Sequence, residues 1–195
     1  MFAEGEYISY GCNGVCKVDG IVEREVPDTK EKREYYVLRP VYNKGGIIYS
    51  PVDGSKISAR RRIMTREESY DLLDHVSQVE RIEEKDKKAM ELRCKEAVQS
   101  GECREWMIVI KTLLYERKQR LDQGKKLTST GERYLKEAKD RLCGELAVAL
   151  EQERKQVENL LKQKLDIARQ TVRKYMGCDT LPKRAGKERL PYYLY

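Results

Sequence analysis

Histidine is almost absent from this sequence, and its scarcity limits the chemistry that the chain can perform. His75 is the single histidine among 195 residues, so a histidine-based metal site or a Ser–His–Asp triad has little to build on. The sequence also lacks an HExxH motif and a glycine-rich phosphate-binding loop followed by lysine. We therefore expect a protein that is not an enzyme and that uses no cofactor, no metal and no small-molecule substrate.

Paired cysteines are missing too. The six cysteines include no CxxC pair. Cys12 and Cys16 are separated by three residues and have no second pair to complete a zinc site. The sequence therefore favours reduced thiols, buried or half-buried, over a metal or redox role.

Long apolar runs and targeting signals are also lacking. No apolar stretch approaches the roughly 20 residues that a membrane-spanning helix needs. Residues 1–6 do not show the basic end and apolar stretch of a secretory signal. We expect a cytoplasmic protein that contacts no membrane.

Charge, in contrast, is plentiful. Charged residues make up 37% of the sequence and apolar residues 39%, which predicts a thin or divided core. The net charge is +7, and residues 169–195 alone carry seven basic against two acidic side chains. Any basic face elsewhere must arise from clustering. Residues 177–195 are predicted to form a flexible basic tail.

Residues 1–64 predict a small β-barrel domain. Five short strands are expected at about 6–10, 15–25, 34–42, 47–52 and 57–63, because branched and aromatic residues there alternate between turn signals. Asn13-Gly14 is a strong hairpin signal, and Gly20 predicts a bulge or a sharp bend. A sheet of this size must bend strongly if its edges are not to stay exposed.

Residues 65–176 predict an all-α domain. Thr65 and Glu68 fit a capping box, and further helices are expected over about 86–99 and 102–121. Trp106 lies on one apolar stripe with Val109 and Ile110, which favours core packing over base stacking.

The last helix is predicted to be long. Residues 129–132 (STGE) fit a second capping box, and an apolar stripe then continues as far as Tyr175, giving one helix of about forty residues. Such a helix would project from the bundle. Leu160, Leu161 and Leu165 would then form a partner-binding stripe, unless they pack back on the bundle.

Several segments resemble one known family. Residues 5–15 (GEYISYGCNGV), 34–38 (EYYVL) and 48–51 (IYSP) are followed by LTSTGE at 127–132 and GELA at 144–147. In this order they resemble CarD/CdnL-type transcription regulators over roughly residues 4–165. The resemblance implies an α+β fold, with an SH3-like or Tudor-like N-terminal β-barrel before a helical domain that ends in the long helix.

The resemblance also implies a partner, the RNA polymerase β subunit, which the barrel would bind through an exposed strand. Arg24 corresponds to an arginine that touches polymerase in family members. A second family arginine is replaced here by Tyr49. The side chains predicted to contact polymerase are Arg24, Tyr36, Leu38, Ile48, Tyr49 and Pro51.

The helical domain is implied to lie against promoter DNA at the upstream edge of the melted bubble, where it changes the lifetime of the open complex. The family acts at ribosomal RNA and growth-linked promoters, and the chain would join the nucleoid through polymerase. Some members insert a tryptophan into the minor groove. That position falls near Lys87 here, with Lys88 beside it. From the residues themselves, Lys125 and Lys126 precede a predicted helix N-terminus, which offers free N–H groups to phosphate, unless they belong to an ordinary loop. Lys87 and Lys88 could likewise stay in water, balanced by Glu84 and Asp86.

Two readings stay open. In the first, the barrel binds polymerase while Lys87, Lys88, Lys125 and Lys126 bind DNA. In the alternative, the chain is a protein-only adaptor whose long helix recruits a partner without DNA contact. The Arg60-Arg61-Arg62 run is either a contact to phosphate or to an acidic patch, or a solvated strand end.

Overall fold

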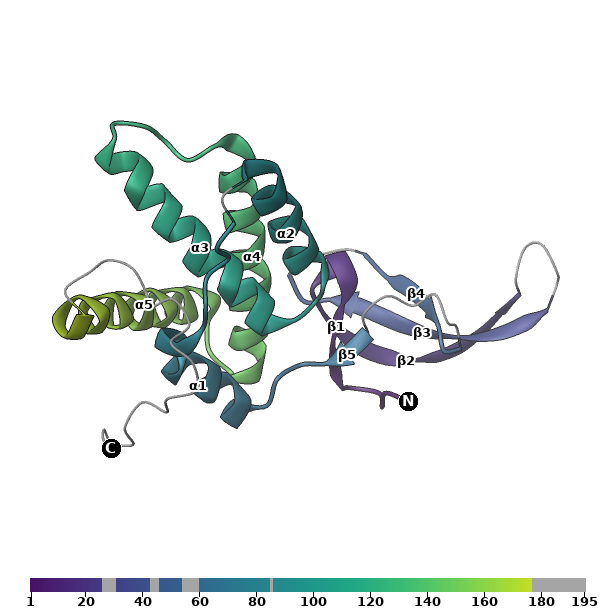
Figure 1. Cartoon of the computed structure of the whole chain (residues 1–195). Coiled ribbons are helices and arrows are strands. Elements are labelled where there is room, and N and C mark those ends of the chain that lie inside the picture. The colour runs from purple at the N-terminus through teal and green to yellow at the C-terminus, as the bar shows by residue number, and fades with distance from the viewer. Residues whose placement is uncertain (26–30, 43–45, 54–59, 85, 177–195) are drawn as a thin grey trace, which may run out of the picture.

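The structure, a computed structural model, describes residues 1–25, 31–42, 46–53, 60–84 and 86–176. A five-stranded antiparallel sheet comes first and five α-helices follow (Figure 1). The predicted α+β class is therefore confirmed. The tail predicted at residues 177–195 lies outside the described residues.

The sheet has the strand order β4-β3-β2-β1-β5. Its strands are β1 (Tyr7–Tyr10), β2 (Val15–Glu25), β3 (Lys32–Pro40), β4 (Ile48–Pro51) and β5 (Arg60–Arg62). A 3-10 turn, η1 (Gly11–Asn13), joins β1 to β2. The predicted bulge is confirmed, because the β2–β3 register shifts between Val18 and Gly20, and Gly20 has a φ of 146° that other residues rarely adopt.

The inner face of the sheet holds a small core. Its fully buried members are Ile8, Cys16, Val18, Tyr36 and Leu38. Phe2 packs over this core, with its ring centroid 5.8 Å from that of Tyr36. Such a small core gives the domain little apolar burial of its own.

Arg60 links the two ends of the bent sheet. It belongs to β5, yet its guanidinium donates to the carbonyl oxygens of Pro51 (2.8 Å) and Val52 (3.1 Å) at the end of β4. The same group lies 5.1 Å from the centroid of the Tyr36 ring. The sheet is thus curled enough for a side chain on one edge strand to reach the other, as expected of a barrel.

The helices are α1 (Arg66–Asp74), α2 (Lys87–Gln99), α3 (Cys103–Asp122), α4 (Ser129–Ala149) and α5 (Arg154–Met176), with a 3-10 turn, η2 (Val76–Gln78), after α1. The capping box at Thr65 and Glu68 is confirmed. The one predicted for α4 is wrong, because Thr128 is the N-cap and accepts from the Gly131 N–H. None of these helices, within the described residues, is long and apolar enough to cross a membrane.

The single forty-residue helix is wrong as well. Helix α4 ends at Ala149, where Glu151 N–H donates to the Val148 carbonyl (3.3 Å) and Gln152 N–H to the Ala147 carbonyl (3.0 Å). These two bonds form a Schellman motif, with Glu151 at φ 53° in the position that glycine usually takes. The chain therefore turns, and α5 starts in a new direction (Figure 1).

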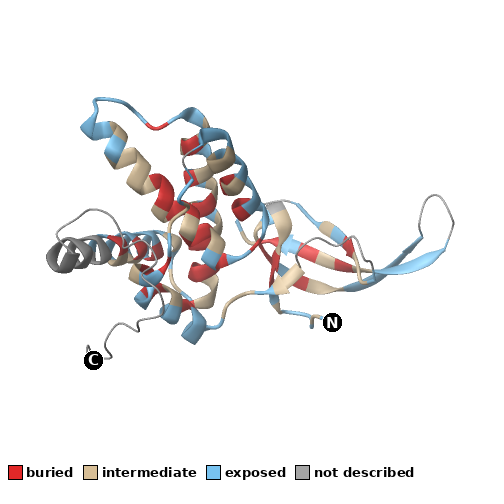
Figure 2. Cartoon of the chain, in the orientation of Figure 1, coloured by how far each residue is buried: buried red, intermediate tan, exposed pale blue. Residues whose placement is uncertain are grey.

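Because of this turn, the predicted partner-binding stripe is not exposed. Leu161 and Leu165 are buried with Val157 in the core of the helical domain, and Leu160 packs against it. The core is centred where α3 crosses α4 (Figure 2). Trp106 lies there, 1% exposed, and its Nε1–H donates to the Val98 carbonyl (3.1 Å), so the expected core role is confirmed.

Candidate functional site

Strand β4 is one edge of the sheet within the described residues. The N–H of Val52 donates to the Glu34 carbonyl (2.8 Å), and hydrogen-bonded pairs alternate along antiparallel strands. The N–H and C=O of Tyr49 therefore point away from β3. Pro51 has no N–H, and its carbonyl is taken by Arg60. The strand thus offers a short unpaired edge centred on Tyr49.

The outer sheet face beside this edge is largely apolar. Val22 and Tyr35 pair in one row, and Val37 and Tyr49 pair in the next. Val22 is 38% exposed and Tyr49 is 39% exposed. The guanidinium carbon of Arg24 lies 3.7 Å from the centroid of the Tyr49 ring, a cation–π geometry. Edge and face therefore meet at one arginine–tyrosine pair, which is accessible from outside.

The structure separates the side chains that were predicted to contact polymerase into two groups. Arg24, Tyr49 and Pro51 lie on the outer face. The side chains of Tyr36 and Leu38 lie in the barrel core, 2% and 0% exposed, on a strand that pairs on both sides. Their prediction as surface contacts is therefore corrected.

Ile48, which was also predicted to contact polymerase, is partly buried against the same core as Tyr36, so its prediction is corrected as well. Two side chains of the outer face, Tyr35 and Val37, were not among the predicted contacts. Tyr35 and Val37 alternate with Tyr36 and Leu38 and so face outward, next to Tyr49 and Pro51. The alternation of side chains along the strand shows that Tyr35 and Val37 share one face and Tyr36 and Leu38 the other. It does not show which of the two faces meets the core.

The three consecutive arginines all bind within the chain. Arg60 joins β5 to β4, as described above. Arg61 pairs with Glu145 on α4, with 2.6 Å between Nη1 and Oε1. Arg62 donates to Glu68 Oε2 (2.7 Å), and this bond is the main cause that lowers the pKa of Glu68 to about 2. The run is neither a free phosphate-binding patch nor merely a solvated strand end.

The four lysines predicted to bind DNA are exposed and lie toward one end of the helical domain. Lys87 and Lys88 begin α2, and Lys125 and Lys126 stand just before α4. Farther along the two helices, Arg141 Nη1 on α4 donates to the carbonyl of Val98, near the end of α2 (2.9 Å). Figure 1 shows α2 and α4 running in the same direction, so their N-termini share one end of the helical domain.

Two features of this end favour anions, the exposed lysines and the helix N-termini, while Asp86 and Glu132 at the same N-termini offset part of the positive charge. The first backbone N–H groups of a helix have no partner inside the helix, and its dipole favours negative charge there. Asp86 accepts from the Ala89 N–H, and Thr128 from the Gly131 N–H. Each cap satisfies one of the early N–H groups. Phosphate oxygens could accept from others while the lysines neutralise their charge.

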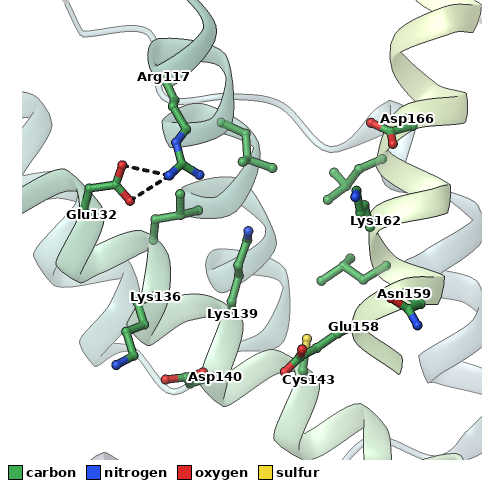
Figure 3. A pocket seen from close by; sticks show the side chains of 14 residues that line it. Arg117, Glu132, Lys136, Lys139, Asp140, Cys143, Glu158, Asn159, Lys162 and Asp166 are labelled. Atoms are coloured by element: carbon green, nitrogen blue, oxygen red, sulfur yellow. Dashed lines mark hydrogen bonds and ion pairs between the residues drawn. The ribbon is translucent and has the colours of Figure 1, made fainter. Parts of the chain in front are cut away.

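A groove of about 590 Å³ runs between α4 and α5 and touches α3. Its floor is apolar, and Figure 3 shows charged side chains around it from both walls. Four are basic and four acidic: Arg117, Lys136, Lys139, Lys162, Glu132, Asp140, Glu158 and Asp166. The rim is formally neutral, and Arg117 is paired with Glu132. The groove therefore lacks the net positive charge of a phosphate site.

Four thiols are buried and free: Cys16, Cys94, Cys103 and Cys143. Burial raises the pKa of each, to about 11 for Cys16 and Cys94 and to about 12 for Cys143. The expectation of buried, reduced thiols is confirmed for these four. In the part of the chain that the structure describes, no group of three or more His, Cys, Asp or Glu is placed to hold a metal ion.

One comparison with known proteins gives a match. Residues 2–63 match the family model of the CarD-like/TRCF RID domain. The matched segment contains all five strands and ends before α1. A search of curated proteins found no match to the chain. The comparison therefore concerns the sheet and its β4 edge, not the helices.

Proposed function

Because residues 2–63 form a CarD-like/TRCF RID domain, we propose that this chain is a transcription regulator that binds RNA polymerase through that domain. RID stands for RNA polymerase-interacting domain. The partner is the β subunit, as the sequence resemblance implies. The protein acts by binding and performs no chemistry of its own.

The free β4 edge with its Arg24–Tyr49 pair is the observation that carries this proposal. A partner strand added at β4 would bond to the outward N–H and C=O of Tyr49, which supplies affinity without catalysis. The neighbouring row of Val22 and Tyr35 would bury apolar area. Arg24 could keep its contact with the Tyr49 ring and still donate to a carboxylate of the partner.

The helical domain, we further propose, lies against promoter DNA at the upstream edge of the melted bubble and changes the lifetime of the open complex. The exposed lysines at the N-terminal ends of α2 and α4 support this. Each phosphate contact would release a counterion, so binding should weaken as salt rises. The buried Trp106 takes no part in DNA contact.

The adaptor alternative loses its predicted surface. It required Leu161 and Leu165 on a projecting helix, and both side chains are packed into the bundle. The DNA-contacting reading is therefore the better supported of the two.

The test measures the affinity of the full chain for core RNA polymerase, with Arg24→Glu as the variant. The change reverses a charge beside the β4 edge and should weaken binding about tenfold or more, the loss of one charge-assisted contact. Arg104→Glu, an exposed site on α3, is the matched control and should bind like the wild type. Equal affinities of all three proteins would refute the docking surface.

A footprint of the polymerase–promoter complex tests the DNA contact separately. The double variant Lys87→Gln/Lys88→Gln should bind polymerase normally but protect the upstream bubble edge less. Its salt dependence should be shallower by about two phosphate contacts. If the wild type leaves the footprint of polymerase unchanged at low salt, the DNA half of the proposal is wrong.

A further inference from the structure

Arg61 joins three separate parts of the chain through one side chain. Its backbone pairs with Ser9 in the sheet. Its guanidinium forms a two-pronged bond to the Glu145 carboxylate on α4, at 2.6 and 2.9 Å. Its Nε donates to the Gly101 carbonyl (2.8 Å) between α2 and α3. The sheet, the α2–α3 connection and α4 therefore meet at a single guanidinium.

Two carboxylates pair with Arg61: Glu102, which lies 3.7 Å from Nε and is exposed, and Glu145, whose charge is removed from water. Glu145 is 1% exposed, and besides Arg61 it accepts from the Met64 N–H (3.0 Å). Met64 lies between β5 and α1, so the connection between the two domains is itself bonded to α4. A buried carboxylate that loses its arginine is strongly unfavourable, which makes the pair a stringent constraint on domain orientation.

A second contact lies one residue away on α4. The Tyr42 hydroxyl donates to the Gly144 carbonyl (2.9 Å). A Cβ on residue 144 would lie 3.0 Å from the Tyr42 ring, a tighter contact than side chains usually make, so glycine lets the ring approach without being displaced. Gly144 and Glu145 thus form one contact site on α4 for the N-terminal domain. Gly144 contacts the ring of Tyr42, and Glu145 pairs with Arg61.

If the function proposed above holds, this contact site on α4 determines how the polymerase-binding and DNA-binding surfaces are placed relative to each other. The β4 edge belongs to the sheet, while the four DNA-facing lysines belong to the helical domain. A protein that touches polymerase and DNA at once must hold these two surfaces in one relative orientation. If the domains were free to rotate, ordering them would cost conformational entropy upon binding.

We propose that Arg61 and Glu145 are positioning residues: their buried ion pair fixes the sheet against the helices, so that the polymerase and DNA contacts can form together. Neither residue touches polymerase or DNA. Breaking the pair should leave the polymerase-binding surface and the DNA-binding surface intact. It should remove only their fixed relative orientation.

The variant Glu145→Gln tests this, because it keeps the shape and an acceptor oxygen but removes the charge. Spin labels at Lys17→Cys on β2 and Gln123→Cys after α3, both exposed, report the distance between the domains in the full chain, with Cys12 and Cys178 replaced by serine. The wild type should give one narrow distance distribution, and Glu145→Gln a broad one. Arg61→Lys, which keeps the charge but not the two-pronged bond, should broaden it less. It also serves if Glu145→Gln fails to fold.

The control breaks a different pair in the same arginine run. Arg62→Gln/Glu68→Gln removes an exposed ion pair and should leave the distance distribution narrow. A general loss of stability would broaden the distance distribution of the control as well as those of the Arg61 and Glu145 variants. A positioning role broadens the distribution only in the Arg61 and Glu145 variants.

Binding measurements complete the test. Glu145→Gln should bind core polymerase within about twofold of the wild type, yet lose protection of the upstream bubble edge about tenfold. A narrow distribution in both Glu145→Gln and Arg61→Lys would overturn the inference, as would a broad one with an unchanged footprint. If the wild type does not bind polymerase, the proposed function fails, and the distance distributions alone decide whether the pair fixes the domains.

Discussion

The guanidinium of Arg24 on β2 stacks over the ring of Tyr49 on β4, 3.7 Å from its centroid, although a third strand lies between the two. The family resemblance places an arginine where Tyr49 stands in this chain. Tyr49 cannot supply the positive charge of that arginine, but its ring gives the guanidinium of Arg24 an aromatic face to stack on. The pair holds a positive group beside the outward-pointing N–H and C=O of Tyr49.

Replacement of Tyr49 by alanine should therefore weaken binding to core RNA polymerase about fivefold to tenfold, because it removes exposed aromatic area and releases Arg24 from its stacked position. Tyr70→Ala is the matched control, since Tyr70 on α1 is 37% exposed, close to the 39% of Tyr49. Titration of immobilised polymerase measures both. An equal loss for the two variants would mean that tyrosine area in general, and not this surface, determines affinity.

Trp106→Phe should lower the free energy of unfolding by about 1–3 kcal/mol, because it leaves a cavity and removes the donor to the buried Val98 carbonyl. The salt dependence of promoter binding should not change, since the tryptophan is in the core. Urea unfolding and a salt series on the same preparation measure the two effects. A change in the salt slope without loss of stability would contradict the core assignment.

Glu151→Gly should stabilise the chain by about 1 kcal/mol, because glycine adopts the left-handed conformation at the end of α4 without strain. Glu151→Ala keeps a Cβ and should stay close to the wild type. Thermal unfolding compares the three proteins. If Gly and Ala are equivalent, the backbone at this turn is not strained.

The prediction of one long helix failed at this same turn for a physical reason. The apolar spacing of α4 continues into α5, so that Leu150 and Val157 would lie on the same face of one continuous helix. The usual sign of a helix end is a glycine, but the left-handed residue here is glutamate. A glutamate in that conformation leaves no local signal, and only the packing of Leu161 and Leu165 shows that the chain has turned.

Local signals served better elsewhere. The five strands, the bulge at Gly20 and the capping box at Thr65 each depend on a few neighbouring residues, and all were predictable. The pair of Arg61 and Glu145 was not, because its partners are 84 residues apart in sequence. In the sequence, the run of Arg60 to Arg62 indicates a concentration of positive charge but not the partner of each arginine. The buried partner that gives Arg61 its role becomes visible only when the domains are packed.

The pH dependence of stability should carry the signature of Lys111. Its ammonium donates to the carbonyls of Val76, Ser77 and Val79, while burial lowers its pKa from about 10.5 to about 8. Between these values the unfolded chain binds the proton and the native chain does not, so this residue's contribution to the free energy of unfolding rises with pH. Lys111→Met should lack that rise.

Urea titrations of wild type and Lys111→Met at pH 7, 8, 9 and 10 isolate the effect, because the other titrating groups are common to both proteins. The free energy of unfolding of the wild type, relative to the variant, should increase from pH 8 upward. A constant difference would show that the native amine keeps its ordinary pKa.

Hydrogen exchange gives the most direct test of the polymerase-binding surface. Backbone amide exchange in the full chain is followed by mass spectrometry with and without core RNA polymerase. Peptides that cover β4 should exchange more slowly in the complex, because a partner strand would bond to the free N–H of Tyr49. Peptides from Glu153 to Leu165 should not change. Unchanged exchange at β4 in a complex that demonstrably forms would contradict the account.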